Sequence, residues 1–138
     1  MMKLVIIDGQ GGRLGSLVTE EVKKAALPYE IYAIGTNSIA TAAMLKAGAD
    51  YGATGENPVV VACRDADAIV GPIGIVAADS LLGEVTPKMA IAVGQSTASK
   101  LLVPVNRCRI AVMGVRPLSM VELVRETVEQ LKALCGRE

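Results

Sequence analysis

The spacing of apolar residues changes from a continuous run to a helical repeat within the first 25 residues, and this change is the feature that most constrains the fold. Residues 3–8 form an apolar run rich in β-branched side chains up to Asp8, which predicts a strand buried on both faces. Four glycines follow between positions 9 and 15, and apolar residues then recur at helical spacing over 14–25, before Pro28 bars further helix. A strand, a glycine turn and a helix in this order predict the first unit of a doubly wound α/β fold.

The rest of the chain repeats this alternation. Further strands are expected at 30–34, 49–54, 66–70, 100–105 and 109–115, and further helices at 37–48, 58–64, 86–94 and 119–134. Because the link 106–108 is too short for a parallel crossover, the last two strands are expected to pair as an antiparallel hairpin. We therefore predict a Rossmann-like, doubly wound, mostly parallel sheet with one antiparallel strand near an edge, in a single domain over residues 1–138.

Composition narrows the function classes. Apolar residues make up 51% of the chain while Phe and Trp are absent, so the core must be aliphatic, as suits a parallel sheet covered by helices. The 14 basic and 14 acidic side chains balance and form no basic tail, which argues against a nucleic-acid partner. Without histidine, and with three cysteines in no CxxC pair, no Cys/His metal set can form; free thiols in a reducing compartment are expected.

Location and assembly follow from the same apolar residues. The longest stretch without a charged or polar side chain, 68–78, is far shorter than the roughly 20 residues of a membrane span. The N-terminal apolar run is also too short for a signal peptide, so a cytoplasmic protein without a membrane partner is expected. A high apolar fraction in a small chain leaves apolar surface to cover, and we expect a homo-oligomer, most simply a dimer.

The strongest functional signal is the glycine loop. It reads Gly9-Gln10-Gly11-Gly12-Arg13-Leu14-Gly15. Glycines between a buried strand and a helix allow a tight turn and the close approach of a pyrophosphate, and the amides at the helix start favour an anion. Arg13 opposes the helix dipole, which makes more sense if an anion binds there. The alternative is that the glycines only make a tight turn and Arg13 points into solvent. The loop predicts a small phosphate-bearing ligand.

Two further segments are expected at the same edge of the sheet. A fold that binds NAD usually ends its second strand with an acid, but this chain has Gly35, Thr36 and Asn37 there. These residues would instead contact the 2′-phosphate of NADP or the ribose of a mononucleotide, unless Asn37 or Ser38 only caps the next helix. The turn Gly71-Pro72-Ile73-Gly74 follows a predicted strand and either lines the floor of a pocket or forms a rigid turn.

Candidate catalytic residues are harder to assign, and whether the protein is an enzyme stays open. Histidine, the commonest general base, is absent. The remaining candidates, none at diagnostic spacing, are Asp8, Glu56, Asp65, Asp67, Asp79, Glu84 and Lys88. Of these, Asp79 and Glu84 lie in the irregular stretch after residues 71–74, where a substrate contact is most easily placed.

Two resemblances support the fold. Residues 9–15 resemble the cofactor loop of dihydrodipicolinate reductases and, more loosely, that of prephenate dehydrogenases, which implies cofactor contacts from Gly9, Gly12 and Gly15. Nearly the whole chain resembles a small bacterial family of uncharacterised Rossmann-like proteins. The segments that carry this second resemblance are 7–12, 35–37, 46–50, 52–57 and 71–74.

Three hypotheses follow for the function. The first is a module that binds a nucleotide, either NADP-like or a mononucleotide. The second is a structural homo-oligomer without a cofactor, and the third is a small enzyme that acts on an anionic metabolite in the same crevice.

Overall fold

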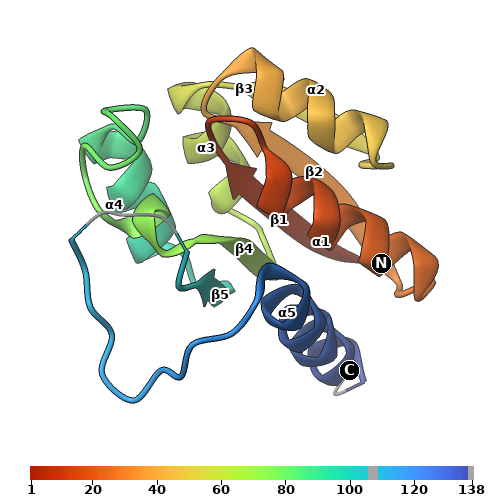
Figure 1. The fold of residues 1–138 in the computed structure, drawn as a ribbon. Helices are drawn as coiled ribbons and strands as arrows, with labels where there is room; N and C mark the ends of the chain where they lie inside the picture. The colour runs from red at the N-terminus through yellow and green to blue at the C-terminus, as the bar shows by residue number, and fades with distance from the viewer. Residues whose placement is uncertain (106–108, 137–138) are drawn as a thin grey trace.

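A five-stranded parallel sheet forms the centre of the protein (Figure 1). The computed structural model describes residues 1–105 and 109–136. The strand order is β3-β2-β1-β4-β5, with β1 Met2–Asp8, β2 Tyr29–Gly35, β3 Tyr51–Thr54, β4 Ala68–Pro72 and β5 Ser99–Val103. The helices are α1 Arg13–Lys24, α2 Ser38–Lys46, α3 Glu56–Cys63, α4 Pro87–Gln95 and α5 Met120–Cys135, with a short 3-10 helix, η1 Ile73–Val76. The order places β1 in the middle, as a doubly wound sheet requires.

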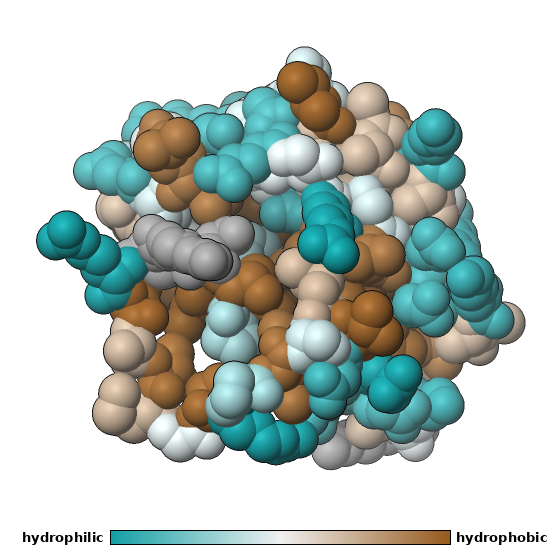
Figure 2. All heavy atoms as spheres, in the orientation of Figure 1, coloured by the Kyte–Doolittle hydropathy of each residue, from teal (hydrophilic) through white to brown (hydrophobic). Residues whose placement is uncertain are grey.

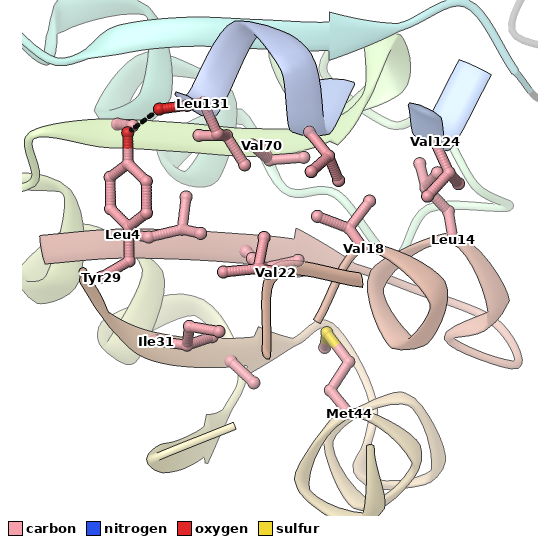
Figure 3. Packing of buried hydrophobic residues seen from close by; sticks show 14 of the residues in the cluster. Leu4, Leu14, Val18, Val22, Tyr29, Ile31, Met44, Val70, Val124 and Leu131 are labelled. Atoms are coloured by element: carbon pink, nitrogen blue, oxygen red, sulfur yellow. Dashed lines mark hydrogen bonds between the residues drawn. The ribbon is translucent and has the colours of Figure 1, made fainter. Parts of the chain in front are cut away.

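Helices cover both faces of the sheet, and alternate residues of β1 point into the two cores. Leu4 and Ile6 lie in the core formed with α1, α2 and α5 (Figure 3). Val5 and Ile7 lie in the other core, under α3 and α4. All four side chains are at most 1% exposed, which explains the uninterrupted apolar run in the sequence.

The C-terminal helix is also attached to the sheet through a buried polar contact. The hydroxyl of Tyr29, at the start of β2, donates a 2.6 Å hydrogen bond to the carbonyl oxygen of Leu131 in α5 (Figure 3). This bond satisfies the phenolic group inside an otherwise aliphatic core.

Three helix starts follow the expected capping chemistry. Asn37 caps α2 by accepting from the amide of Ala40, and Thr86 caps α4 with Pro87 as the first helical residue. Ser119 opens α5 with a reciprocal capping box. The start of α3 is different, because Gly55 is its N-cap and Pro58 is its third residue. Proline is tolerated there because an amide in the first turn has no intrahelical partner.

The prediction of an antiparallel strand near an edge of the sheet is wrong. All pairings among the described strands are parallel, and residues 109–115 form no strand but an irregular, exposed segment that ends in a turn with Gly114 at φ +84°. The expected hairpin turn at 106–108 lies outside the described residues. Ile110, Val112 and Val115 have the β-branched side chains typical of a strand, but they pair with no strand among the described residues. Strand β5 is therefore an edge of the described sheet.

The register of the strands brings the predicted site segments to one edge. Asp8 of β1 lies beside Gly35 of β2, and Gly35 lies beside Thr54 of β3. On the other side, Gly71 packs against β1, since a Cβ at Gly71 would lie 2.5 Å from the carbonyl oxygen of Ile7. Loop 9–12, residues 35–37 and residues 71–74 therefore all lie at the carboxyl edge of the sheet. In the described part of the chain, no helix has the length and apolar character needed to cross a membrane.

Candidate functional site

The β1–α1 loop is held in shape by the carboxylate of Asp8. Its Oδ1 accepts from the amide of Gly9 at 2.8 Å, and its Oδ2 accepts from the amide of Gly15 at 2.7 Å. Asp8 is 5% exposed, and this burial raises the pKa of its carboxyl against the opposing effect of the two amides. One buried carboxylate thus joins both ends of the turn, and we assign Asp8 a structural role in the loop.

Three of the four loop glycines are needed by the protein's own packing. A Cβ at Gly9 would lie 2.5 Å from Oγ1 of Thr36, and a Cβ at Gly15 would overlap the Met44 sulfur. Gly12 adopts a left-handed conformation with φ +71°, and its Cβ would lie 2.8 Å from the Cα of Ala40. The close-turn interpretation therefore accounts for these three positions.

Gly11 is different, and it leaves an open backbone surface. No described residue lies within 4 Å of a Cβ placed on Gly11, other than its two neighbours in the chain, and Gly11 is exposed. Within the described residues, the amides of Gly11, Arg13 and Leu14 have no hydrogen-bond acceptor. The Arg13 side chain is exposed beside them and makes no ion pair with any described residue. This corner has donors and a positive charge, and α1 has no side-chain cap.

Glu84 is brought to this edge from the segment between η1 and α4. Its Oε1 accepts from the hydroxyl of Thr36 at 2.6 Å, from the amide of Gln10 at 2.9 Å and from Nδ2 of Asn37 at 2.9 Å. Partial burial raises the pKa of the Glu84 carboxyl, but the hydrogen bonds from Thr36, Gln10 and Asn37 outweigh it and hold the pKa below its usual range. Glu84 is therefore an ionised acceptor that links loop 9–12 to the end of β2.

This arrangement changes the roles expected for Thr36 and Asn37. Thr36 donates its hydroxyl to Glu84. Asn37 both caps α2 and donates to Glu84, and its Nδ2 also contacts the carbonyl of Gln10 at 2.9 Å. The structure thus combines the capping role of Asn37 with a place at the edge of the loop. Gly35 lies beneath them, with no room for a side chain because Thr41 is packed against it.

The turn 71–74 lies under other residues of the chain. Gly71, Pro72 and Gly74 are buried and Ile73 is half-buried, because the segment 77–86 folds back over them. The hydroxyl of Ser80 donates to the carbonyl of Gly74, and a Cβ at Gly74 would lie 2.9 Å from that hydroxyl oxygen. Gly74 therefore supports Ser80 from below, whereas Ile73 lines an open hollow with Pro104 and Leu118.

The segment that carries Glu84 contains a strained turn. Asp79, Leu81 and Leu82 have φ values of +67°, +55° and +57°, and Gly83 follows at +87°. Left-handed conformations cost a residue other than glycine roughly 1–2 kcal/mol each. Leu81 is buried over Gly9, whereas Leu82 is 97% exposed. The backbone accepts this strain where it directs Glu84 towards loop 9–12.

Sequence reasoning did not predict this position of Glu84. Glu84 is 74 residues from Gln10 and 48 from Thr36, and no local pattern connects them. The only signal available was the missing acid at the end of β2, which left a group of donors there without an acceptor.

Of the other candidate catalytic groups, Asp65 and Asp67 lie away from this edge, whereas Glu56 follows the carboxyl end of β3 and Asp79 lies in the turn that precedes Glu84. Asp65 pairs with Lys3, and the carboxylate of Asp67 accepts from the amide of Lys3, both at the opposite end of β1. Cys63 is buried, and burial raises the pKa of its thiol to about 11, so it is a poor nucleophile. Among the described residues, no cluster of acidic or cysteine side chains could hold a metal ion, and Cys63 and Cys135 are free thiols. Cys108 lies outside the described residues.

An open groove lies elsewhere, along the edge strand β5. It has a volume of about 670 Å³ and runs between β5 and α5, with Lys100, Leu102, Pro104, Leu123 and Glu126 among its lining residues. Beside it, the irregular segment 109–118 exposes apolar side chains. The brown atoms at the lower left of Figure 2 lie where Figure 1 places this segment.

Comparison with known proteins gives a family match and a similar solved structure. The family model "Domain of unknown function (DUF3842)" matches residues 3–136. The chain belongs to the DUF3842 family. This agrees with the expected resemblance of nearly the whole chain to an uncharacterised family. No curated protein matches the DUF3842 chain.

Among solved structures, the DUF3842 chain is similar to a dodecameric FMN-dependent Ubix-like decarboxylase from Escherichia coli O157:H7. The two share 14% sequence identity with a TM-score of 0.45, over 98% of this chain and 94% of the other. Neither this match nor the family match is to a dihydrodipicolinate reductase, so that resemblance stays confined to residues 9–15.

Proposed function

We propose that this protein binds a small phosphate-bearing ligand, a nucleotide, at the β1–α1 loop. The observation that carries the proposal is the set of amides at Gly11, Arg13 and Leu14, which have no acceptor among residues 1–105 and 109–136, at the start of a 12-residue helix. Amides at a helix N-terminus point outward and the helix dipole favours negative charge, so a phosphate is the ligand that suits them best. The exposed guanidinium of Arg13 adds a cation at the same place.

The position in the fold supports the same proposal. In open parallel sheets, ligands bind outside the carboxyl ends of the strands, where the connections from neighbouring strands turn in opposite directions. Here β1 connects through α1 to β2, and β4 lies on its other side. Loop 9–12 stands at that point.

The proposal is tested by ligand-dependent thermal stability and by titration calorimetry with pyrophosphate, AMP, NAD and FMN. A ligand at 100 times its Kd should stabilise the protein by roughly 2.7 kcal/mol. Gly11→Ala adds a methyl group that meets no described residue within 4 Å, so it should keep the fold and weaken binding by crowding a ligand at the amide of Gly11. Gly94→Ala is the matched control, because Gly94 is an exposed glycine in α4 with equally free space.

Arg13→Ala should weaken binding, whereas Arg125→Ala, at an exposed arginine of α5, should not. The proposal is wrong if none of the phosphate compounds binds the wild-type protein, or if Gly11→Ala binds them as the wild type does.

A second candidate function is self-assembly without a cofactor, through the segment 109–118. Ile110, Val112, Met113 and Val115 are between 42% and 82% exposed, and all but Met113 line a hollow with Pro104, which directly follows β5. Exposed apolar groups of this kind mark contact surfaces, and a second copy of the chain is the simplest occupant. Sedimentation velocity should show an oligomer that Met113→Lys converts to a monomer, while Ile39→Lys, at an exposed isoleucine of α2, has no effect.

A further inference from the structure

The end of β2 lacks the acid that nucleotide-binding sheets usually carry there, yet a carboxylate stands at that place. Strand β2 ends at Gly35, followed by Thr36 and Asn37. In a doubly wound fold the acid at this position accepts hydrogen bonds from the ribose hydroxyls of the ligand. Here the carboxylate of Glu84 reaches the same residues from the connection between β4 and α4.

The surroundings of Glu84 fix one of its oxygens and leave the other available. All three hydrogen bonds, from Thr36, Gln10 and Asn37, end on Oε1. Oε2 accepts no hydrogen bond from any described residue, and the side chain is only half-buried. A carboxylate has acceptor capacity for several donors, so Oε2 retains full capacity for a hydroxyl group of a ligand.

The order of residues along the loop places Glu84 next to the proposed phosphate site. The amide that binds Glu84 belongs to Gln10, and the next residue, Gly11, has the first of the uncovered amides. A phosphate at Gly11 and Arg13 would therefore have its attached sugar close to Glu84.

We infer that Glu84 is a specificity-determining residue that binds the vicinal hydroxyls of a ribose, so that the ligand is a ribonucleotide with free 2′- and 3′-hydroxyl groups. The inference rests on the proposed function, which it makes more specific. An ionised carboxylate accepts hydrogen bonds from hydroxyls and repels a 2′-phosphate. Of the ligands considered from the sequence, this disfavours NADP and favours nucleotides without a 2′-phosphate.

The test compares three ligands that differ only at the 2′ position: AMP, 2′-deoxy-AMP and adenosine 2′,5′-bisphosphate. Titration calorimetry on the wild-type protein should give a Kd for AMP about tenfold lower than for either of the others, as expected for the loss of a hydrogen bond to a charged group. In Glu84→Gln, AMP should bind about tenfold more weakly and the bisphosphate should no longer be disfavoured. Asp65→Asn is the control, because it removes an exposed carboxylate at the opposite end of β1 and should leave all three Kd values unchanged.

Pyrophosphate separates this inference from the proposed function. If pyrophosphate and all three nucleotides bind the wild-type protein with equal affinity, the phosphate site stands and the role of Glu84 is overturned. If neither pyrophosphate nor any nucleotide binds, both proposals fail. If Glu84→Gln binds pyrophosphate more tightly than the wild type does, Glu84 occupies the phosphate position itself, and the ribose assignment is again overturned. The comparison within the wild type needs no variant, so a folding defect in Glu84→Gln would not spoil the test.

Discussion

The carboxylate of Glu84 accepts a hydrogen bond from the backbone amide of Gln10 at 2.9 Å, across a sequence separation of 74 residues. This contact joins the connection between β4 and α4 to the β1–α1 loop, and Thr36 and Asn37 add two more donors from the end of β2. The carboxylate of Glu84 therefore joins three segments at the carboxyl edge of the sheet: its own β4–α4 connection, the β1–α1 loop and the end of β2.

The stability of this contact should depend on pH. The pKa of the Glu84 carboxyl lies below its ordinary value of 4.5 in the folded protein, so its stabilising effect is present above pH 4.5 and is lost as the pH falls through the folded pKa. We expect Glu84→Gln to be less stable than the wild type by about 1 kcal/mol at pH 7, because charge-assisted hydrogen bonds become neutral ones. The difference should shrink towards pH 3, as measured by urea unfolding.

The pH dependence of stability that Asp8 contributes has the opposite sign to that of Glu84. Burial raises its pKa above 3.8, so its contribution to stability is present at low pH and is lost as the pH rises through the folded pKa. The charge of Glu84 is one of the causes that raise the pKa of Asp8, so Glu84→Gln should also lower the pKa of Asp8 somewhat. A stability difference that stays constant from pH 7 to pH 3 would contradict the ionised state of Glu84.

Two neighbouring glycines of the loop should respond very differently to alanine. Gly12→Ala forces a side chain into a left-handed backbone, with its Cβ 2.8 Å from the Cα of Ala40, and should cost at least about 2 kcal/mol. Gly11→Ala meets open space and should change the free energy of unfolding by no more than about 0.5 kcal/mol. Equal losses in the two variants would show that the loop is not held in this conformation.

Leu82 offers a substitution that should stabilise the protein. Its φ of +57° is strained for leucine, and its 97% exposed side chain makes little contact that could be lost. Leu82→Gly relieves roughly 1–2 kcal/mol of strain against an entropic cost of roughly 0.5–1 kcal/mol, so we expect a net gain of about 0.5 kcal/mol. Val121→Gly, at a 61% exposed helical position, should instead lose about 1 kcal/mol in the same denaturation experiment.

The buried hydroxyl of Tyr29 should contribute to the attachment of α5. Tyr29→Phe removes the 2.6 Å hydrogen bond to the carbonyl of Leu131 and should lower the free energy of unfolding by about 1 kcal/mol. Tyr51→Phe is the control, since Tyr51 is 52% exposed and keeps its ring stacked on Tyr32. Hydrogen exchange of the α5 amides should increase in the first variant and not in the second.

Much of the fold could be predicted from the sequence because its local and tertiary signals agree. The apolar run of β1, the caps at Thr86 and Ser119 and the periodicity of α1 each specify an element without help from distant residues. Residues 109–115 have the composition of a strand, but a strand also needs a neighbour to pair with, and composition does not reveal whether one exists. That is why the antiparallel edge strand was predicted and is absent from the described sheet.

The candidate site could be predicted only in part. The glycines and Arg13 are contiguous, so their position between a strand and a helix was readable from the sequence. Glu84 reaches the loop through a turn built from residues with unfavourable backbone angles, and sequence patterns describe favourable conformations. Sequence patterns therefore did not indicate that Glu84 binds the amide of Gln10.

Asp8 gives the loop a property that matters for the speed of recognition. Because its buried carboxylate accepts hydrogen bonds from the amides of Gly9 and Gly15, the turn is preorganised before a ligand binds. Ligand binding then requires little ordering of the backbone, so the binding free energy is not reduced by a conformational change of the loop. A phosphate compound should consequently be captured in a single fast kinetic phase, without a slow rearrangement of the turn afterwards.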